Sequence, residues 1–198
     1  MYSAQRPLHA YSPRYDEALR FAARAHRSQL RKGTDIPYIA HPVAVSVILL
    51  RHGFGEDLAV AGLLHDVVED CDVPIARIAA AFGPQVARLV EAVSETKAAG
   101  GAERPWEERK AEKIAHLLAG GPDVAALKAA DALHNIHSIL VDMAEVGAAV
   151  WRRFKRGATP TLWYYREILG GVEGQLGDHP LTRELAAAVD ALAASVPA

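Results

Sequence analysis

Cysteine is almost absent from this chain of 198 residues, which contains only Cys71. A lone cysteine cannot form an intramolecular disulfide, and this usage fits a reducing compartment.

Long apolar runs are missing as well. The longest notable run, residues 58–64, is far shorter than the roughly 20 residues that span a bilayer. The first ten residues also lack the apolar segment of a secretory signal, so we expect a cytoplasmic protein without a membrane partner.

An excess of positive charge is also lacking. Twenty-two Lys and Arg face 24 Asp and Glu, which gives a net charge of -2. No overall basic field supports non-specific binding to nucleic acid, so an anionic substrate must meet a local basic cluster. Hydrophobic residues make up 51% and charged residues 23%, an ordinary globular mixture. This length and composition predict a single domain over residues 1–198.

Helical spacing of apolar residues dominates the chain, and two-residue alternation is not apparent. Ser12-Pro13 is typical of a helix cap followed by proline at the first helical position. We therefore expect an all-α bundle of about 8–10 helices. They cover approximately residues 13–26, 42–52, 56–70, 74–83, 84–93, 106–119, 123–141, 144–155, 161–174 and 180–195, and loops are expected at 31–37 and 97–105.

The segment from His65 to Asp70 combines an imidazole with three carboxylates. On a continuous helix His65 would lie over Glu69, and Asp66 over Asp70, since residues four apart share a face. Such a cluster beside the apolar run is costly unless a cation binds it. A divalent metal would offset that cost and could activate a water molecule. Taken alone, the segment fits the solvated acidic end of a helix equally well.

Two further residues qualify as ligands of the same metal. His41 lies where a loop turns into a helix, and Asp131 interrupts an otherwise apolar helical segment. An isolated carboxylate in such a segment requires a partner. Imidazoles mixed with carboxylates suit Mn²⁺, Fe or another borderline ion. His134 and His137, three residues apart, offer a less specific pair of imidazoles.

Four segments carry a family resemblance. They read AHRSQLRKGTDIPYIAHP, LLHDVVEDCD, FGPQVARLVEAVSETK and LKAADALHNI. In this order they resemble the HD phosphohydrolase superfamily, and within it the hydrolase domain of RelA/SpoT proteins and of stand-alone small alarmone hydrolases. The resemblance is clear over about residues 12–141 and weaker over the helices expected at about 144–195.

The resemblance implies Mn²⁺-dependent removal of the 3′-pyrophosphate from ppGpp and pppGpp, leaving GDP or GTP. Its small-molecule nucleotide substrate would be the principal partner. The chain is too short to add the family's synthetase or regulatory domains, so we expect hydrolysis only. By resemblance the metal ligands are His41, His65, Asp66 and Asp131, the residues that act on the attacking water are Glu69 and Asp70, and the substrate contacts are Arg31, Lys32, Tyr38, Asn135 and Tyr164.

Several alternatives stay open at this point. Arg31 and Lys32 by themselves fit an exposed loop end, and Asn135 fits a surface amide. An arginine that contacts substrate in the family, one turn before the tyrosine, is replaced by Pro160. The base is therefore open between (p)ppGpp and (p)ppApp. A general HD nucleotidase, an NADPH 2′-phosphatase or a nucleotide sensor without turnover are the other hypotheses, and the oligomeric state is not predicted.

Overall fold

The computed structural model describes residues 12–95, 98–99 and 102–196, and these are overwhelmingly helical. The all-α prediction is confirmed. Besides the helices, β1 and β2 are two-residue strands paired antiparallel, with Ala98 opposite Glu103. The elements are α1 (Pro13–Ala25), α2 (Ala40–Arg51), α3 (Glu56–Leu64), α4 (Val67–Asp70), α5 (Ile75–Phe82), α6 (Pro84–Val93), β1 (Ala98–Ala99), β2 (Ala102–Glu103), α7 (Trp106–Val146), the 3₁₀ helix η1 (Gly147–Arg153), α8 (Ala158–Leu176) and α9 (Pro180–Ser195).

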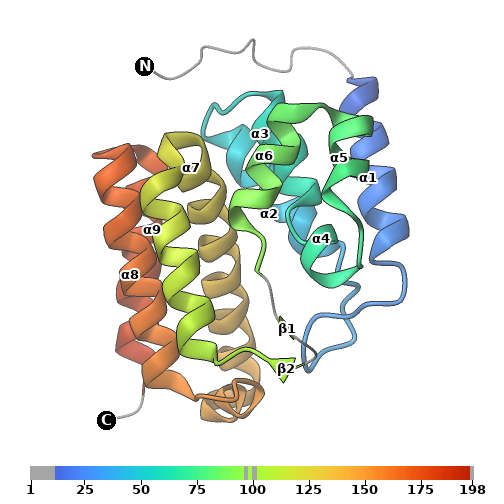
Figure 1. The fold of residues 1–198 in the computed structure, drawn as a ribbon. Coiled ribbons are helices and arrows are strands. Elements are labelled where there is room, and N and C mark those ends of the chain that lie inside the picture. The colour runs from blue at the N-terminus through green and yellow to red at the C-terminus, as the bar shows by residue number, and fades with distance from the viewer. Residues whose placement is uncertain (1–11, 96–97, 100–101, 197–198) are drawn as a thin grey trace.

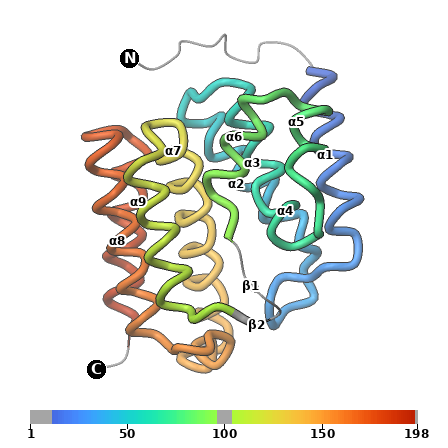
Figure 2. The backbone as a smooth tube through the Cα atoms, viewed as in Figure 1, coloured from blue at the N-terminus to red at the C-terminus, as the bar shows by residue number. Residues whose placement is uncertain are grey.

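The long helix α7 lies between two groups of helices (Figure 1). Helices α8 and α9 pack on one side of it, and α2, α3 and α6 pack on the other. The backbone tube in Figure 2 shows the same division. Gly121 has φ 78° and ψ -177°, which kinks α7 where the sequence predicts a break between two helices. Pro122 follows it, and a proline at that position cannot continue the hydrogen-bond ladder.

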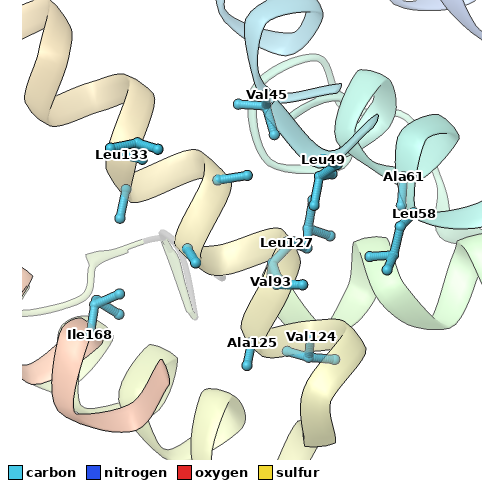
Figure 3. Close-up of a cluster of buried hydrophobic side chains, with 14 of the residues drawn as sticks. Val45, Leu49, Leu58, Ala61, Val93, Val124, Ala125, Leu127, Leu133 and Ile168 are labelled. Atoms are coloured by element: carbon cyan, nitrogen blue, oxygen red, sulfur yellow. The ribbon is translucent and has the colours of Figure 1, made fainter. Parts of the chain in front are cut away.

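The core is built from small and branched apolar side chains of these helices (Figure 3). Leu49 of α2, Leu127 and Leu133 of α7, and Ile168 of α8 are fully buried. Each contributes about 1.5–3 kcal/mol relative to an exposed side chain. This packing fixes α2, α3 and α7 against one another, and these helices carry the polar residues described below.

Two predicted helices are wrong in their extent. The helix expected over 56–70 is interrupted, because α3 ends at Leu64 and α4 begins at Val67. Asp66, with φ -100° and ψ -6°, is the N-cap of α4, so the chain turns at His65 and Asp66 between the two helices. The helix expected at 144–155 is instead the end of α7 followed by η1, since Gly147 has a positive φ of 60° that ends the α-helix.

Helix beginnings agree better with the sequence. The side chain of Ser12 accepts a hydrogen bond from the Tyr15 N–H, and Pro13 is the first residue of α1. Prolines also open α6 and α9. In the described part of the chain, no helix combines the length and the apolar character that crossing a bilayer requires.

Candidate active site

Four polar side chains from three distant segments of the sequence converge where α2, α3 and α7 meet. The Nε2 atoms of His41 and His65 are 3.2 Å apart. Asp66 Oδ2 lies 3.0 Å from His65 Nε2 and 3.5 Å from His41 Nε2. Asp131 Oδ1 lies 3.3 Å from His41 Nε2 and 3.9 Å from His65 Nε2. The fold thus brings together the four residues that the sequence predicts as metal ligands.

The spacing of these donor atoms suits one cation. Ligands about 2.1 Å from an ion lie about 3.0–3.4 Å from one another in octahedral or tetrahedral geometry. His41, His65 and Asp66 offer ligand atoms that all lie within 4.8 Å of one another. The two histidines are almost fully buried, so bulk water cannot satisfy their facing nitrogens. This donor set fits a divalent transition metal.

Outer hydrogen bonds orient both imidazoles. His65 Nδ1 lies 2.9 Å from the Gly62 carbonyl oxygen, so Nδ1 carries the proton and donates it. His41 Nδ1 lies 2.8 Å from His134 Nδ1, where one nitrogen donates to the other. When His41 Nδ1 is the donor to His134, as His65 Nδ1 is to Gly62, the Nε2 atoms of both rings carry lone pairs that face the cluster. Such outer partners set the tautomer of metal-binding histidines.

The electrostatics of the cluster favour a cation. Burial lowers the pKa of His65, but the neighbouring Asp66 and Asp131 carboxylates raise it to about 9. Burial raises the pKa of Asp66, but His65 and then His41 hold it well below the ordinary range of a carboxyl. Carboxylates that stabilise a proton on a buried imidazole also stabilise a metal ion in the same place.

A chain of hydrogen bonds connects the cluster to the predicted substrate contacts. Lys128 Nζ donates to Asp131 Oδ2 at 2.7 Å, which leaves Oδ1 directed toward the histidines. Asn135 Nδ2 donates to Asp131 Oδ1 at 2.6 Å, and Arg31 Nη2 donates to Asn135 Oδ1 at 2.8 Å. Burial raises the pKa of Asp131, but Lys128 together with His41 and His65 lowers it far below its usual range.

Tyr38, in the loop before α2, contacts the cluster through Asp66. Its hydroxyl donates to Asp66 Oδ2 at 2.6 Å. Burial, followed by the charge of Asp66, raises the pKa of Tyr38 well above its ordinary value, so the phenol stays a donor. The His26 ring lies on one face of Tyr38, with ring centroids 4.8 Å apart, and Arg31 lies 5.6 Å from the centroid of the same ring.

The two acidic residues of α4, Glu69 and Asp70, accept hydrogen bonds from different parts of the chain. Glu69 Oε2 accepts hydrogen bonds from the Glu95 N–H and from Lys113 Nζ, both at 3.0 Å. Asp70 Oδ2 instead accepts from Gln29 Nε2 at 2.9 Å. The expected single helix face carrying all four groups of the segment is therefore wrong, because the turn at His65 and Asp66 rotates α4 relative to α3.

A small polar cavity lies against one side of the cluster. It has a volume of about 190 Å³ and includes Glu69, Tyr164 and three lysines in its lining. The Tyr164 hydroxyl is buried and has no hydrogen-bond partner among the described residues. A buried phenol without a partner costs about 1–3 kcal/mol, which a ligand accepting its proton would offset. The lysines are Lys110, Lys113 and Lys128.

A larger and more apolar cavity, of about 410 Å³, also has His41 in its lining. The predicted substrate contacts Arg31, Lys32, Tyr38 and Asn135 all line it. Ile139, Val150, Phe154 and the face of Tyr165 supply apolar walls, while Ser138, Asp142 and Arg153 supply polar groups. Tyr38, His41, Asn135 and Tyr165 line both cavities, so two cavities of different character adjoin at His41.

Several residues of this site are not identified from the sequence. Lys110 and Lys113 could have been identified as a pair, since residues three apart on one helix share a face. Lys128 likewise precedes Asp131 by three residues. Asp142 and Arg153 carry no such signal, because they meet only through the fold of η1 against α7.

Comparisons with known proteins agree with this geometry. Residues 18–157 match the HD domain family. Over 126 residues the chain is 40% identical to human guanosine-3′,5′-bis(diphosphate) 3′-pyrophosphohydrolase MESH1, covering 62% of this chain and 68% of the human protein.

Two solved structures are also similar. Listeria monocytogenes lmo0812 superposes with a TM-score of 0.70 at 39% identity, covering 77% of this chain and 97% of that one. A metazoan orthologue of SpoT, described as hydrolysing ppGpp and acting in starvation responses, gives a TM-score of 0.75 at 26% identity over 92% of this chain and 97% of its own. The chain therefore belongs to the HD domain family and, within it, groups with the RelA/SpoT-type hydrolase domains.

Proposed function

We propose that this protein is a Mn²⁺-dependent hydrolase that removes the 3′-pyrophosphate from nucleotide alarmones of the (p)ppGpp type. The observation that carries the proposal is the cluster of His41, His65 and Asp66, with Asp131 3.3 Å from His41, beside a lysine-lined cavity and a larger one. The activity of the human relative and of the metazoan SpoT orthologue supports the same substrate class.

The metal would be held by the Nε2 atoms of His41 and His65 and by one oxygen each of Asp66 and Asp131. Mixed imidazole and carboxylate ligands favour Mn²⁺ or a similar borderline ion. When bound, such an ion polarises a phosphoryl oxygen and lowers the pKa of a water molecule.

In this proposal the two cavities hold the two ends of the substrate. The apolar walls of the larger cavity suit a nucleoside, and Arg31 and Lys32 at that cavity suit its phosphates. The lysines of the smaller cavity suit the 3′-diphosphate that leaves, and the buried Tyr164 hydroxyl is a further donor to it. The scissile bond, between the 3′-oxygen and the first phosphorus, then lies beside the cluster.

Glu69 lines the smaller cavity, where its carboxylate can accept a proton from the attacking water. The water oxygen bonds to the phosphorus that carries the 3′-oxygen, and the bond between that phosphorus and the 3′-oxygen breaks. The 3′-oxygen leaves with the nucleoside and takes up a proton. The products are inorganic pyrophosphate and the nucleoside 5′-diphosphate or 5′-triphosphate.

A substrate panel tests this function. Purified protein with Mn²⁺ is offered ppGpp, pppGpp, ppApp, NADPH and deoxynucleoside triphosphates, and the products are separated. We expect pyrophosphate from the 3′-pyrophosphorylated nucleotides and much slower reaction with the others. Phosphate release from NADPH alone would favour the 2′-phosphatase alternative, and binding of all compounds without turnover would favour a sensor.

Ligand variants test the metal assignment within the same function. Asp66→Ala and Asp131→Ala are expected to lose both bound metal and activity. Asp178→Asn, whose side chain is 84% exposed, is the matched control and should retain both. Retention of metal and activity in both alanine variants would show that the ligand set is wrong.

A further inference from the structure

The end of the larger cavity away from the metal cluster carries an ion pair that the reaction does not use. Asp142 of α7 and Arg153 of η1 contact each other through Oδ2 and Nη1. Both line the cavity, and their side chains are about one-fifth exposed, at 20% and 21%. They are therefore mostly withdrawn from water but open toward a ligand in the cavity.

This pair is packed against the neighbouring segments of the chain. Arg153 packs against the loop before α2, where a Cβ atom at Gly33 would lie 2.7 Å from Arg153 Nε. Val150 and Trp151 of η1 are buried, and the Trp151 ring contacts Phe154 with centroids 5.7 Å apart. The carboxylate of Asp142 thus has a defined position on the cavity wall.

The position of Asp142 on α7 matches the length of a nucleotide. His134, Asn135, Ser138, Ile139 and Asp142 all line the cavity from one face of the helix. Asp142 follows Asp131 by 11 residues, which corresponds to about 16 Å along the helix axis. A nucleoside whose 3′-phosphate lies at the cluster would extend its base over this distance toward Asp142.

A carboxylate at that end selects for hydrogen-bond donors. Phosphates offer it only acceptors, whereas the ribose hydroxyls and the base offer donors, and of these the base lies farthest from a 3′-phosphate at the cluster. Guanine presents two adjacent donors, N1–H and the 2-amino group, which a carboxylate can accept together. Adenine presents an acceptor at N1 beside a single amino donor, and its N1 lone pair would face the carboxylate. Arg153 neutralises Asp142 and can donate to the O6 and N7 acceptors of guanine.

We propose that Asp142, positioned by Arg153, makes the larger cavity selective for guanine over adenine. This assignment rests on the proposed function, because it places the nucleoside of the substrate in that cavity. The sequence leaves the choice between guanine and adenine open, and this assignment favours guanine. It also gives η1 a role in base selection, through Arg153.

The test compares substrates that differ only in the base. For the wild type we expect kcat/KM for ppGpp to exceed that for ppApp by about 10- to 100-fold, the discrimination typical of one bidentate contact. The inosine analogue, which lacks the 2-amino group, should fall between them. In Asp142→Asn the amide can pair with adenine, so the ratio should fall toward one, mainly through loss of ppGpp activity.

A control variant distinguishes base selection from a purely structural role, in which the Asp142–Arg153 ion pair only holds η1 against α7. Arg153→Gln breaks the same ion pair but leaves the carboxylate, so it should lower activity on both substrates and keep a preference for guanine. If Asp142→Asn lowers activity on ppGpp and ppApp equally, the ion pair only holds η1 against α7, and the proposal is overturned. A wild type that prefers ppApp overturns it as well.

Binding measurements keep this test independent of turnover. Calorimetric titration of the wild type and Asp142→Asn with GDP and with ADP reads the base preference directly, whether or not any 3′-pyrophosphate is hydrolysed. We expect tighter binding of GDP by the wild type, reduced or lost in Asp142→Asn. Equal or undetectable binding of both nucleotides by the wild type overturns base selection, whereas GDP preference without hydrolysis would refute only the proposed function.

Discussion

At the scale of single residues, the turn at His65 and Asp66 matters most. Neighbouring side chains on a regular helix diverge by about 100° and cannot converge on one point. The turn between α3 and α4, where His65 caps one helix and Asp66 the other, lets the Asp66 carboxylate approach His65 Nε2 to 3.0 Å. Here the buried Leu63 and Leu64 anchor the turn from the preceding side.

Removing the charge of Glu69 tests whether its carboxylate accepts the proton of the attacking water. Glu69→Gln keeps the size of the side chain but cannot accept the proton of the attacking water. We expect kcat to fall by about 10²- to 10⁴-fold, with bound metal unchanged. Steady-state kinetics and metal analysis measure the two quantities, and Glu91→Gln on the exposed face of α6 is the control. Unchanged kcat would show that Glu69 is structural only.

His134 is expected to act on metal affinity through His41. Without the contact to His41 Nδ1, the tautomer of His41 is no longer fixed. His134→Ala should weaken metal binding by about 10- to 100-fold, while kcat largely recovers at saturating metal. Titration with Mn²⁺ gives both values. The control is His137→Ala, an exposed histidine on the same helix, and equal affinities in the two variants would contradict the positioning role.

At the scale of the elements, the contact between α7 and α8 supports the wall of both cavities. Gly171 lets the two helices approach, since a Cβ atom there would lie 2.6 Å from Leu117 Cδ2 and 3.0 Å from Leu117 Cγ. Tyr164 and Tyr165 project from the same α8 into the cavity linings. A shift of α8 would therefore change the site as well as the core.

Two adjacent glycines of α8 give a matched test of this contact. Gly171→Ala should destabilise the protein by about 1–3 kcal/mol, because the methyl group overpacks the interface. Gly170→Ala meets no atom within 4 Å, so it should stabilise the helix by about 0.5–1 kcal/mol. Urea unfolding of both variants measures the difference. Stabilisation by both substitutions would mean that α7 and α8 are not closely packed at Gly171.

The elements also show how far the sequence predicts this structure. Apolar spacing and the prolines at helix starts identify nearly all the helices, and the kink at Gly121 lies where the sequence places a break. The break after Leu64 is missed, because nothing in the local spacing separates a turn from a continuing helix. The approach of Arg153 to Asp142 is also missed, since it depends on the path of η1 across α7. Contacts between distant segments are set by tertiary packing, which periodicity does not encode.

At the scale of the whole molecule, a buried charge network joins the segment after α6 to the long helix α7 beside the smaller cavity. Glu95, which follows α6, pairs with Lys110 at 2.8 Å and Lys113 at 3.3 Å, and also with Arg109. Burial raises the pKa of Glu95, but Lys113, Lys110 and Arg109 together lower it from 4.5 to about 2. The ionised carboxylate therefore stabilises the folded state.

This network predicts a specific dependence of stability on pH. Because the folded-state pKa of Glu95 is lowered, its contribution is complete above about pH 4.5 and is lost as the pH falls toward about 2. A shift of this size corresponds to about 3 kcal/mol. Glu95→Gln should thus be less stable than the wild type at neutral pH, and the difference should shrink below pH 4.5. A difference that is constant over this range would contradict the prediction.

The identity of the products formed in ¹⁸O-labelled water tests the central claim most directly. With Mn²⁺ and ppGpp, ³¹P NMR and mass spectrometry should find GDP without label and inorganic pyrophosphate carrying one ¹⁸O atom. Chelation of the metal should stop the reaction, and added Mn²⁺ should restore it. Release of orthophosphate in place of pyrophosphate, label in GDP, or full activity in the presence of chelator would contradict a metal-dependent 3′-pyrophosphohydrolase.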